Sequence, residues 1–234
     1  MKKVNLLLTL LSLNAVLVTI ERFSFTTKII LQPYSFLRLH EVIQMTVIIL
    51  LSVIIPFFLL KELTGNFEAL KTRKGTWLGV LFVIGTYFYA TGNGAHEIAS
   101  YLFNTFCPIK TFTSTACGSM FFNDFYFGNI LYFIGLLLSN ISLIAFELLK
   151  PTKAFSKKEQ FVTILNGLVY ALTLFAYAAF DRVLVGLVFT IVAALIIDSI
   201  VIIAKKKLAT VPFTLYCTLA YTLSAIAALI IRLH

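Results

Sequence analysis

Residues 183–204 read VLVGLVFTIVAALIIDSIVIIA, an uninterrupted apolar run with a single charged residue, Asp198. A helix needs about 20 apolar residues to cross a hydrocarbon core of roughly 30 Å, and lipid accepts only segments whose backbone hydrogen bonds are satisfied internally. The run is continuous, whereas a strand of a membrane barrel alternates between apolar and polar residues. We therefore predict a transmembrane helix here.

Runs of the same kind recur along the whole chain. They cover residues 4–20, 34–60, 77–95 (or 77–103), 125–148, 161–180 and 211–231. The composition agrees, because 60% of the residues are hydrophobic and 12% are charged, far from the averages of soluble proteins. We expect an all-α, polytopic protein of the cell membrane, with seven transmembrane helices in one bundle over residues 1–234. Only Asp181 and Arg182 separate the fifth helix from the sixth.

The distribution of basic residues predicts the orientation, since Lys and Arg accumulate in cytoplasmic loops. With the N-terminus inside, 13 of the 19 Lys and Arg residues fall on the inner side, and seven helices place the C-terminus outside. The net charge of +9 is thereby explained by topology and anionic headgroups, so no nucleic-acid partner is expected. Glu147 is expected to be solvated beside a basic inner loop, and the oligomeric state stays open.

Two of the three cysteines, Cys107 and Cys117, fall in one predicted outer loop, residues 98–124. An oxidising compartment permits a disulfide between them, whereas Cys217 lies inside the seventh helix. We expect the bridge to close this loop over the outer mouth of the bundle. Two unpaired cysteines are the alternative.

Two similar tetrads, residues 39–42 (LHEV) and 95–98 (AHEI), contain two of the three histidines. A helix beginning at residue 34 places His40 and Glu41 about two turns into the membrane, while His96 and Glu97 end or extend the third helix and Asp124 opens the fourth. All of these side chains then map to the outer third of the bundle. Neighbouring residues on a helix point about 100° apart, so only one member of each His-Glu pair can face inward.

Ionisable groups at membrane depth are a default sign of function. We hypothesise that His40, His96 and Asp124 bind a divalent metal, in preference zinc, because imidazole and carboxylate are its usual ligands. Glu97, or otherwise Glu41, would act as base toward a metal-bound water. The substrate-binding candidates are the neighbouring amides Gln44, Asn93 and Asn129.

This arrangement predicts a metal-dependent hydrolase of a membrane lipid or other small amphipathic substrate, with its site on the extracytoplasmic side. Three alternatives remain open: a small transporter that uses the outer cavity and Asp198, a receptor-like protein that only binds a ligand, and polar residues that merely lie in the wet headgroup zone. The segment 91–94 (TGNG) either unwinds its helix to expose carbonyls or simply ends it.

Seven helices with His and Asp near one face resemble the architecture of the alkaline-ceramidase-like membrane hydrolases, and that resemblance implies a lipid substrate. The motifs of that family are absent. Gly92 stands four residues before His96 where the family has Ser, and the seventh helix has no H-x-x-x-H pattern. No family is assigned on this basis.

Overall fold

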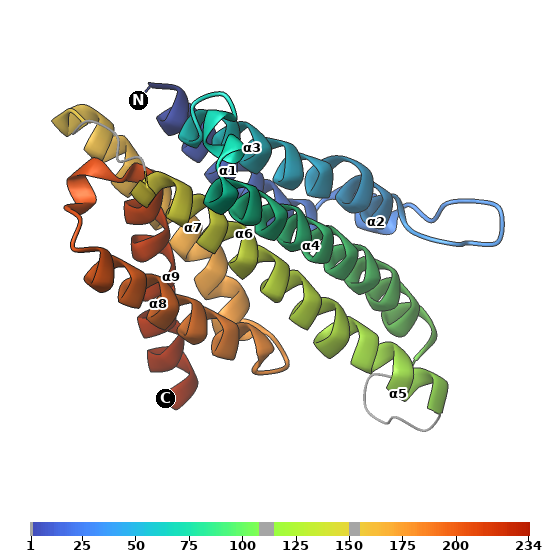
Figure 1. The fold of residues 1–234 in the computed structure, drawn as a ribbon. Helices are drawn as coiled ribbons and strands as arrows, with labels where there is room; N and C mark the ends of the chain where they lie inside the picture. The colour runs from blue at the N-terminus through green and yellow to red at the C-terminus, as the bar shows by residue number, and fades with distance from the viewer. Residues whose placement is uncertain (1, 108–114, 150–154) are drawn as a thin grey trace.

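The computed structural model describes residues 2–107, 115–149 and 155–234. In these ranges the chain forms helices and no strands, which confirms the all-α prediction. The long helices lie side by side in one bundle (Figure 1). Lys150 and Lys153, which contribute to the predicted inner face, lie outside the described residues.

The bundle consists of nine α-helices within the described ranges. They are α1 (Lys2–Glu21), α2 (Leu39–Ile43), α3 (Ile49–Leu63), α4 (Arg73–Phe106), α5 (Thr115–Phe122), α6 (Asn129–Leu149), α7 (Lys157–Phe180), α8 (Val185–Ala204) and α9 (Pro212–Leu233). Two π-helical turns, η2 (Gln44–Ile48) and η4 (Asn123–Gly128), join α2 to α3 and α5 to α6 without a break. Short 3-10 turns complete the described helical structure: η1 (Phe25–Lys28), η3 (Glu68–Lys71) and η5 (Leu208–Thr210).

Within the described residues, six segments are long and apolar enough to cross a membrane. They are Lys2–Lys28, Leu39–Leu63, Thr115–Leu149, Lys157–Phe180, Val185–Ala204 and Pro212–Leu233. Helix α4 is not among them, although its 34 residues make it about 51 Å long and it packs along α6 (Figure 1). Six of the seven predicted spans are therefore found.

The predicted start of the second span at residue 34 is wrong. Residues 29–38 form a hairpin, with a single bridge between Ile30 and Arg38, and the helix begins at residue 39. Tyr34 and Ser35 have φ values of 66° and 53°, a left-handed conformation that a right-handed helix cannot contain. His40 is consequently the second residue of its helix rather than two turns inside it.

The segment 91–94 neither unwinds nor ends α4, which continues through it without interruption. A Cβ atom at Gly92 would lie 2.2 Å from the backbone nitrogen of Tyr132 and 2.6 Å from the carbonyl oxygen of Gly128. The same close approach recurs one heptad earlier, where a Cβ at Gly85 would meet Ser139 of α6 at 2.5 Å. These glycines let α4 and α6 touch backbone to backbone, as small residues do between membrane helices.

The predicted outer loop, residues 98–124, is largely helical at its two described ends. Helix α4 extends to residue 106 and α5 begins at residue 115, while residues 108–114 lie outside the described part. The predicted disulfide is confirmed, because Cys107 and Cys117 are bonded with their Cα atoms 5.6 Å apart. Phe103 and Phe125 are buried beside the bridge, which joins the end of α4 to the first turn of α5.

Two further expectations change at the ends of α7 and α9. The connection between α7 and α8 comprises residues 181–184, longer than the two residues expected. Glu147 is fully buried rather than solvated, since its carboxylate accepts hydrogen bonds from the backbone N–H groups of Phe213 and Thr214 at 2.9 and 2.7 Å. It thereby satisfies the N–H groups that the start of α9 leaves without helical partners.

Candidate functional site

A cavity of about 510 Å³ opens at one end of the bundle, between α1, α3, α4, α6 and α7. Along α1 its lining reaches from Leu11 to Arg22, a length of roughly 16 Å at the helical rise. The deep end is closed by Phe213 and Tyr216 of α9, which are buried, whereas Arg22 and Arg182 at the other end are exposed. The size is typical of a small-molecule site.

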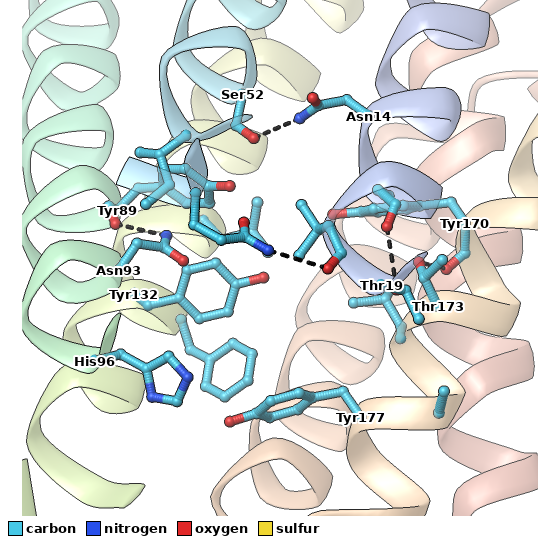
Figure 2. A pocket seen from close by; sticks show the side chains of 18 of the residues that line it. Asn14, Thr19, Ser52, Tyr89, Asn93, His96, Tyr132, Tyr170, Thr173 and Tyr177 are labelled. Atoms are coloured by element: carbon cyan, nitrogen blue, oxygen red, sulfur yellow. Dashed lines mark hydrogen bonds between the residues drawn. The ribbon is translucent and has the colours of Figure 1, made fainter. Parts of the chain in front are cut away.

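Aromatic and amide side chains share the walls of this cavity. In Figure 2, Tyr132 and Tyr177 extend into it, with Asn93 and His96 on the α4 side. The Asn93 amide nitrogen donates to the carbonyl oxygen of Tyr89 at 2.8 Å, which leaves the Asn93 side-chain oxygen as the acceptor on that wall. An apolar body and a polar group of one ligand can therefore be accommodated together.

Two of the predicted residues that line the cavity, Gln44 and Asp124, stand on the π-helical turns η2 and η4. Both side chains are buried. The amide nitrogen of Gln44 donates to the Val18 carbonyl oxygen at 3.2 Å and lies 3.4 Å from Glu21 Oε2. π-turns occur disproportionately at functional sites, and no pattern in the sequence predicts them here.

His96 and Asp124 form the central polar pair at the mouth. His96 Nδ1 lies 2.9 Å from Asp124 Oδ1 and 3.0 Å from the Asp124 backbone oxygen. Because both neighbours are acceptors, Nδ1 carries a proton. Nε2 lies 3.4 Å from Arg22 Nη2, and a guanidinium only donates, so Nε2 presents its lone pair. This geometry fits the Nδ1–H tautomer, with the Nε2 lone pair directed at the Arg22 guanidinium beside the cavity.

His40 does not line the cavity. It lies between two carboxylates, with Nδ1 paired to Glu21 and Nε2 3.7 Å from Glu97 Oε2. Glu21 also accepts from the hydroxyls of Ser24 and Thr26. This cluster fastens the ends of α1, α2 and α4 to one another behind the cavity wall, and it connects the two His-Glu tetrads through His40 and Glu97.

Neither glutamate predicted as base lies on the cavity lining. Glu97 faces His40, as described, and Glu41 is completely buried against Arg38. The Glu41 carboxylate accepts from the Arg38 backbone N–H at 3.0 Å and from the guanidinium Nε at 2.8 Å. Glu41 is the third residue of α2, and its carboxylate reaches back to the N-cap residue Arg38. The Arg38 guanidinium also lies 5.6 Å from the ring centroid of Tyr101.

The three predicted substrate-binding amides separate in the same way. Gln44 and Asn93 line the cavity. Asn129 is buried and donates to the Phe125 carbonyl oxygen at 3.1 Å, within its own helix and away from the lining. Two of the three amides are thus placed where a ligand could reach them.

The chain matches no known protein family, no curated protein and no solved structure. The interpretation of the site therefore depends on its own geometry.

Two residues of the lining carry buried polar atoms that have no hydrogen-bond partner within the described parts of the chain. They are Asn14 Oδ1 and Asp124 Oδ2. An unsatisfied buried polar group costs about 1–3 kcal/mol. Such groups gathered on one cavity indicate a polar ligand rather than a purely apolar one.

Asp181 lies just beyond the end of α7, at the mouth. Burial raises the pKa of its carboxyl group, and the hydrogen bond from the Arg182 backbone N–H opposes this shift. That bond occupies Oδ1 at 2.7 Å, and the Tyr177 hydroxyl is a second hydrogen-bond partner of the carboxylate. The short connection between α7 and α8 thus contributes a carboxylate to the cavity.

The predicted metal ligands are divided between two clusters, with His40 at Glu21 and Glu97, and His96 at Asp124. Among the residues that the structure describes, no group of three or more His, Cys, Asp or Glu side chains is arranged to hold a metal ion. The metal requirement therefore stays a prediction without structural support.

Asp198, the second station of the transporter alternative, lies apart from the cavity. Its carboxylate accepts from the Thr222 hydroxyl at 3.0 and 3.3 Å, between α8 and α9. Asp198 is not among the lining residues. No observation therefore links Asp198 to the outer cavity.

Sequence reasoning missed Glu21, Arg22 and Asn14, and it missed four tyrosines of the cavity, Tyr132, Tyr170, Tyr177 and Tyr216. Glu21 and Arg22 carried a usable signal, because they are the first charged residues after the first apolar run. Asn14 and Tyr132 carried none, since isolated polar or aromatic residues inside a span are as easily explained by helix packing. Only the folded bundle shows that they line one cavity.

Proposed function

We propose that this chain is a membrane-embedded hydrolase of a small amphipathic substrate, with His96 as the general base and Asp124 as the residue that orients it. One observation carries the proposal: the lone pair of His96 Nε2 is presented at the mouth of a cavity with aromatic walls and a polar end. A histidine whose Nδ1–H is held by a carboxylate is the usual arrangement of a general base.

The chemistry assigned to these residues is removal of a proton from a water molecule that attacks a carbonyl carbon. His96 Nε2 accepts this proton, and the carboxylate of Asp124 stabilises the imidazolium that forms. The imidazolium then returns the proton to the leaving amine or alcohol as the carbon–nitrogen or carbon–oxygen bond of the substrate breaks. Before substrate binds, the Arg22 guanidinium donates to His96 Nε2 at 3.4 Å, so substrate binding must release this contact. Arg22, exposed at the mouth, would then donate to the carbonyl oxygen as negative charge develops on it.

The walls favour a lipid-like or otherwise amphipathic substrate. Its apolar part would lie along Tyr132 and Tyr170 toward the closed end at Phe213, and its polar part would stay at Asp124 and Asp181. A substrate dissolved in the bilayer has the same orientation, with its apolar part in the hydrocarbon core and its polar part at the membrane surface.

The proposed membrane arrangement counts α4 as the seventh span, because it lies antiparallel to α6 and exceeds the thickness of the hydrocarbon core. The lysines at the ends of α3 and α8 and at the starts of α1, α4 and α7 then face the cytoplasm. The cavity mouth lies at the other end, on the extracytoplasmic side.

Turnover of a panel of long-chain amides and esters by the purified protein tests the proposal. His96→Gln and Asp124→Asn should each lower the rate about 100-fold or more, while His234→Gln, at the exposed end of α9, should retain it. Hydrolysis that is unchanged in His96→Gln, or absent from the whole panel, would refute the proposed role.

Metal analysis of protein purified without chelator addresses the remaining prediction, that zinc or another divalent ion takes part. Stoichiometric metal that is lost in both His40→Ala and His96→Ala would support the metal-dependent version. Full turnover in protein freed of metal would exclude it.

A further inference from the structure

The available polar atoms of the cavity are unequal in kind. Asn14 Oδ1 and Asp124 Oδ2 have no hydrogen-bond partner among the described residues and can only accept from a ligand. The Asp181 carboxylate accepts from the Arg182 backbone N–H and from the Tyr177 hydroxyl, and its remaining lone pairs are also acceptors. Within the described residues, no buried side-chain N–H donor on the cavity lining is unsatisfied. A ligand rich in hydrogen-bond donors would complement these acceptor atoms.

The orientation of the Asn14 amide is fixed by its neighbours. Its nitrogen donates to the Ser52 hydroxyl at 2.6 Å and lies 3.4 Å from the carbonyl oxygen of Ile48. A carbonyl oxygen cannot donate, so the oxygen of Asn14 must be the atom left without a partner. Asn14 is 5% exposed and Asp124 is 1% exposed, so both acceptors lie in the buried interior of the site.

The two arginines of the lining do not supply the missing donors. The guanidinium of Arg22 lies against His96 Nε2, and that of Arg182 lies 5.4 Å from the ring centroid of Phe125. Both belong to the exposed rim. The formal charges of the four Asp and Arg residues balance, so an overall anionic field does not account for the preference. The positions of the acceptor atoms of Asn14, Asp124 and Asp181 on the lining account for it.

We infer that the cavity selects amphiphiles with a primary or secondary ammonium head group, which donates hydrogen bonds to Asp124 and Asp181. This inference rests on the proposed function and names its substrate class. An ammonium nitrogen carries two or three N–H donors and a positive charge, and hydrogen bonds between charged partners are the strong ones. Tyr132 and Tyr177 add aromatic faces that attract a cation.

Binding of three tail-matched probes to the protein in lipid nanodiscs tests this inference. The probes are dodecylamine, dodecyltrimethylammonium and dodecanoate, and binding to empty nanodiscs is subtracted. We expect dodecylamine to bind about tenfold or more tightly than either of the others, because the trimethylammonium ion has the charge without N–H donors and the carboxylate has neither. Equal binding of the amine and the trimethylammonium ion, or preference for dodecanoate, would overturn the inference.

Isosteric variants connect the preference to particular carboxylates. Asp181→Asn and Asp124→Asn should each lower dodecylamine affinity about tenfold, whereas Asp198→Asn, which changes an aspartate outside the cavity, should leave it unchanged. If Asp124→Asn fails to fold, Asp181→Asn decides the matter, since Asp181 lies at the mouth and outside the His96 pair. Unchanged affinity in Asp181→Asn would overturn the inference.

The two proposals fail separately. Turnover that depends on His96 without any preference for the amine refutes the ammonium head group and leaves the hydrolase standing. Selective amine binding, lost in Asp181→Asn, together with turnover indifferent to His96→Gln, supports the head-group assignment and removes His96 as the base.

Discussion

Replacing Gly92 by alanine tests the contact on which the cavity wall depends. Gly92 lies where the backbones of α4 and α6 touch, one turn before His96. An added Cβ would stand 2.2 Å from the backbone nitrogen of Tyr132, whereas ordinary contact begins at 3.4 Å. The α6 backbone would have to recede by about 1.2 Å, because its backbone atoms, unlike a flexible side chain, cannot rotate away.

The expected magnitude follows from two opposing effects. Overpacking of this kind typically costs about 1–3 kcal/mol and sometimes more, while alanine gains up to about 1 kcal/mol over glycine in helix propensity. Gly94→Ala is the matched control, because a Cβ there meets nothing within 4 Å. Gly94→Ala should keep or slightly raise the free energy of unfolding, and Gly92→Ala should lower it.

Thermal unfolding in one detergent compares the two variants directly, and ligand binding gives a second measurement. Because α6 carries Tyr132 and follows the turn with Asp124, its displacement should also weaken binding in the cavity of Gly92→Ala. Equal melting temperatures for Gly92→Ala and Gly94→Ala would show that the two helices do not pack backbone to backbone at this point.

Three other perturbations follow from the structure. Glu147→Ala should lower the unfolding free energy by about 2–6 kcal/mol, because two buried N–H groups at the start of α9 lose their acceptor. The control Glu68→Ala, which removes an exposed ion pair, should change it by less than about 1 kcal/mol. Equal effects of the two substitutions would contradict the capping role of Glu147. His40→Ala should cost about 3–5 kcal/mol because it leaves two buried carboxylates without their shared partner, while His234→Ala should be silent in the same unfolding measurement. Thiol titration of the denatured, unreduced protein should detect one thiol, Cys217, and three would contradict the disulfide.

The lengths of the apolar runs were enough to predict the helices of the bundle from the sequence. All seven runs became helices close to their expected positions, because each must satisfy its own backbone in lipid. The largest error, at residues 29–38, arose where that rule does not apply. Tyr34 and Ser35 adopt left-handed backbone conformations in a hairpin outside the helix, and neither is a glycine that would mark such a turn.

The sequence predicted at which end of the bundle the candidate residues lie, but not which of their side chains face the cavity. The sequence places His40, Glu97, His96 and Asp124 at one end of the bundle, and the structure agrees. Which side chain faces the cavity depends on helix rotation, and on partners such as Glu21 that become neighbours only after folding. His40 and Glu97 consequently belong to the cluster behind the wall, although each tetrad was expected to supply one residue to a shared site.

The π-turn η4 explains how Asp124 meets His96 while the helix on each side of it keeps its packing. One additional residue in a turn rotates everything beyond it by about 100° relative to a regular helix. Before the turn, α5 directs Cys117 toward the end of α4, and after it, α6 directs Gly135 to within backbone contact of the same helix. The face of α5 before the π-turn and the face of α6 after it thus both pack against α4, and the π-turn between them directs the Asp124 carboxylate toward His96. A regular helix has one continuous face, so periodicity alone predicts the packing and not the position of Asp124.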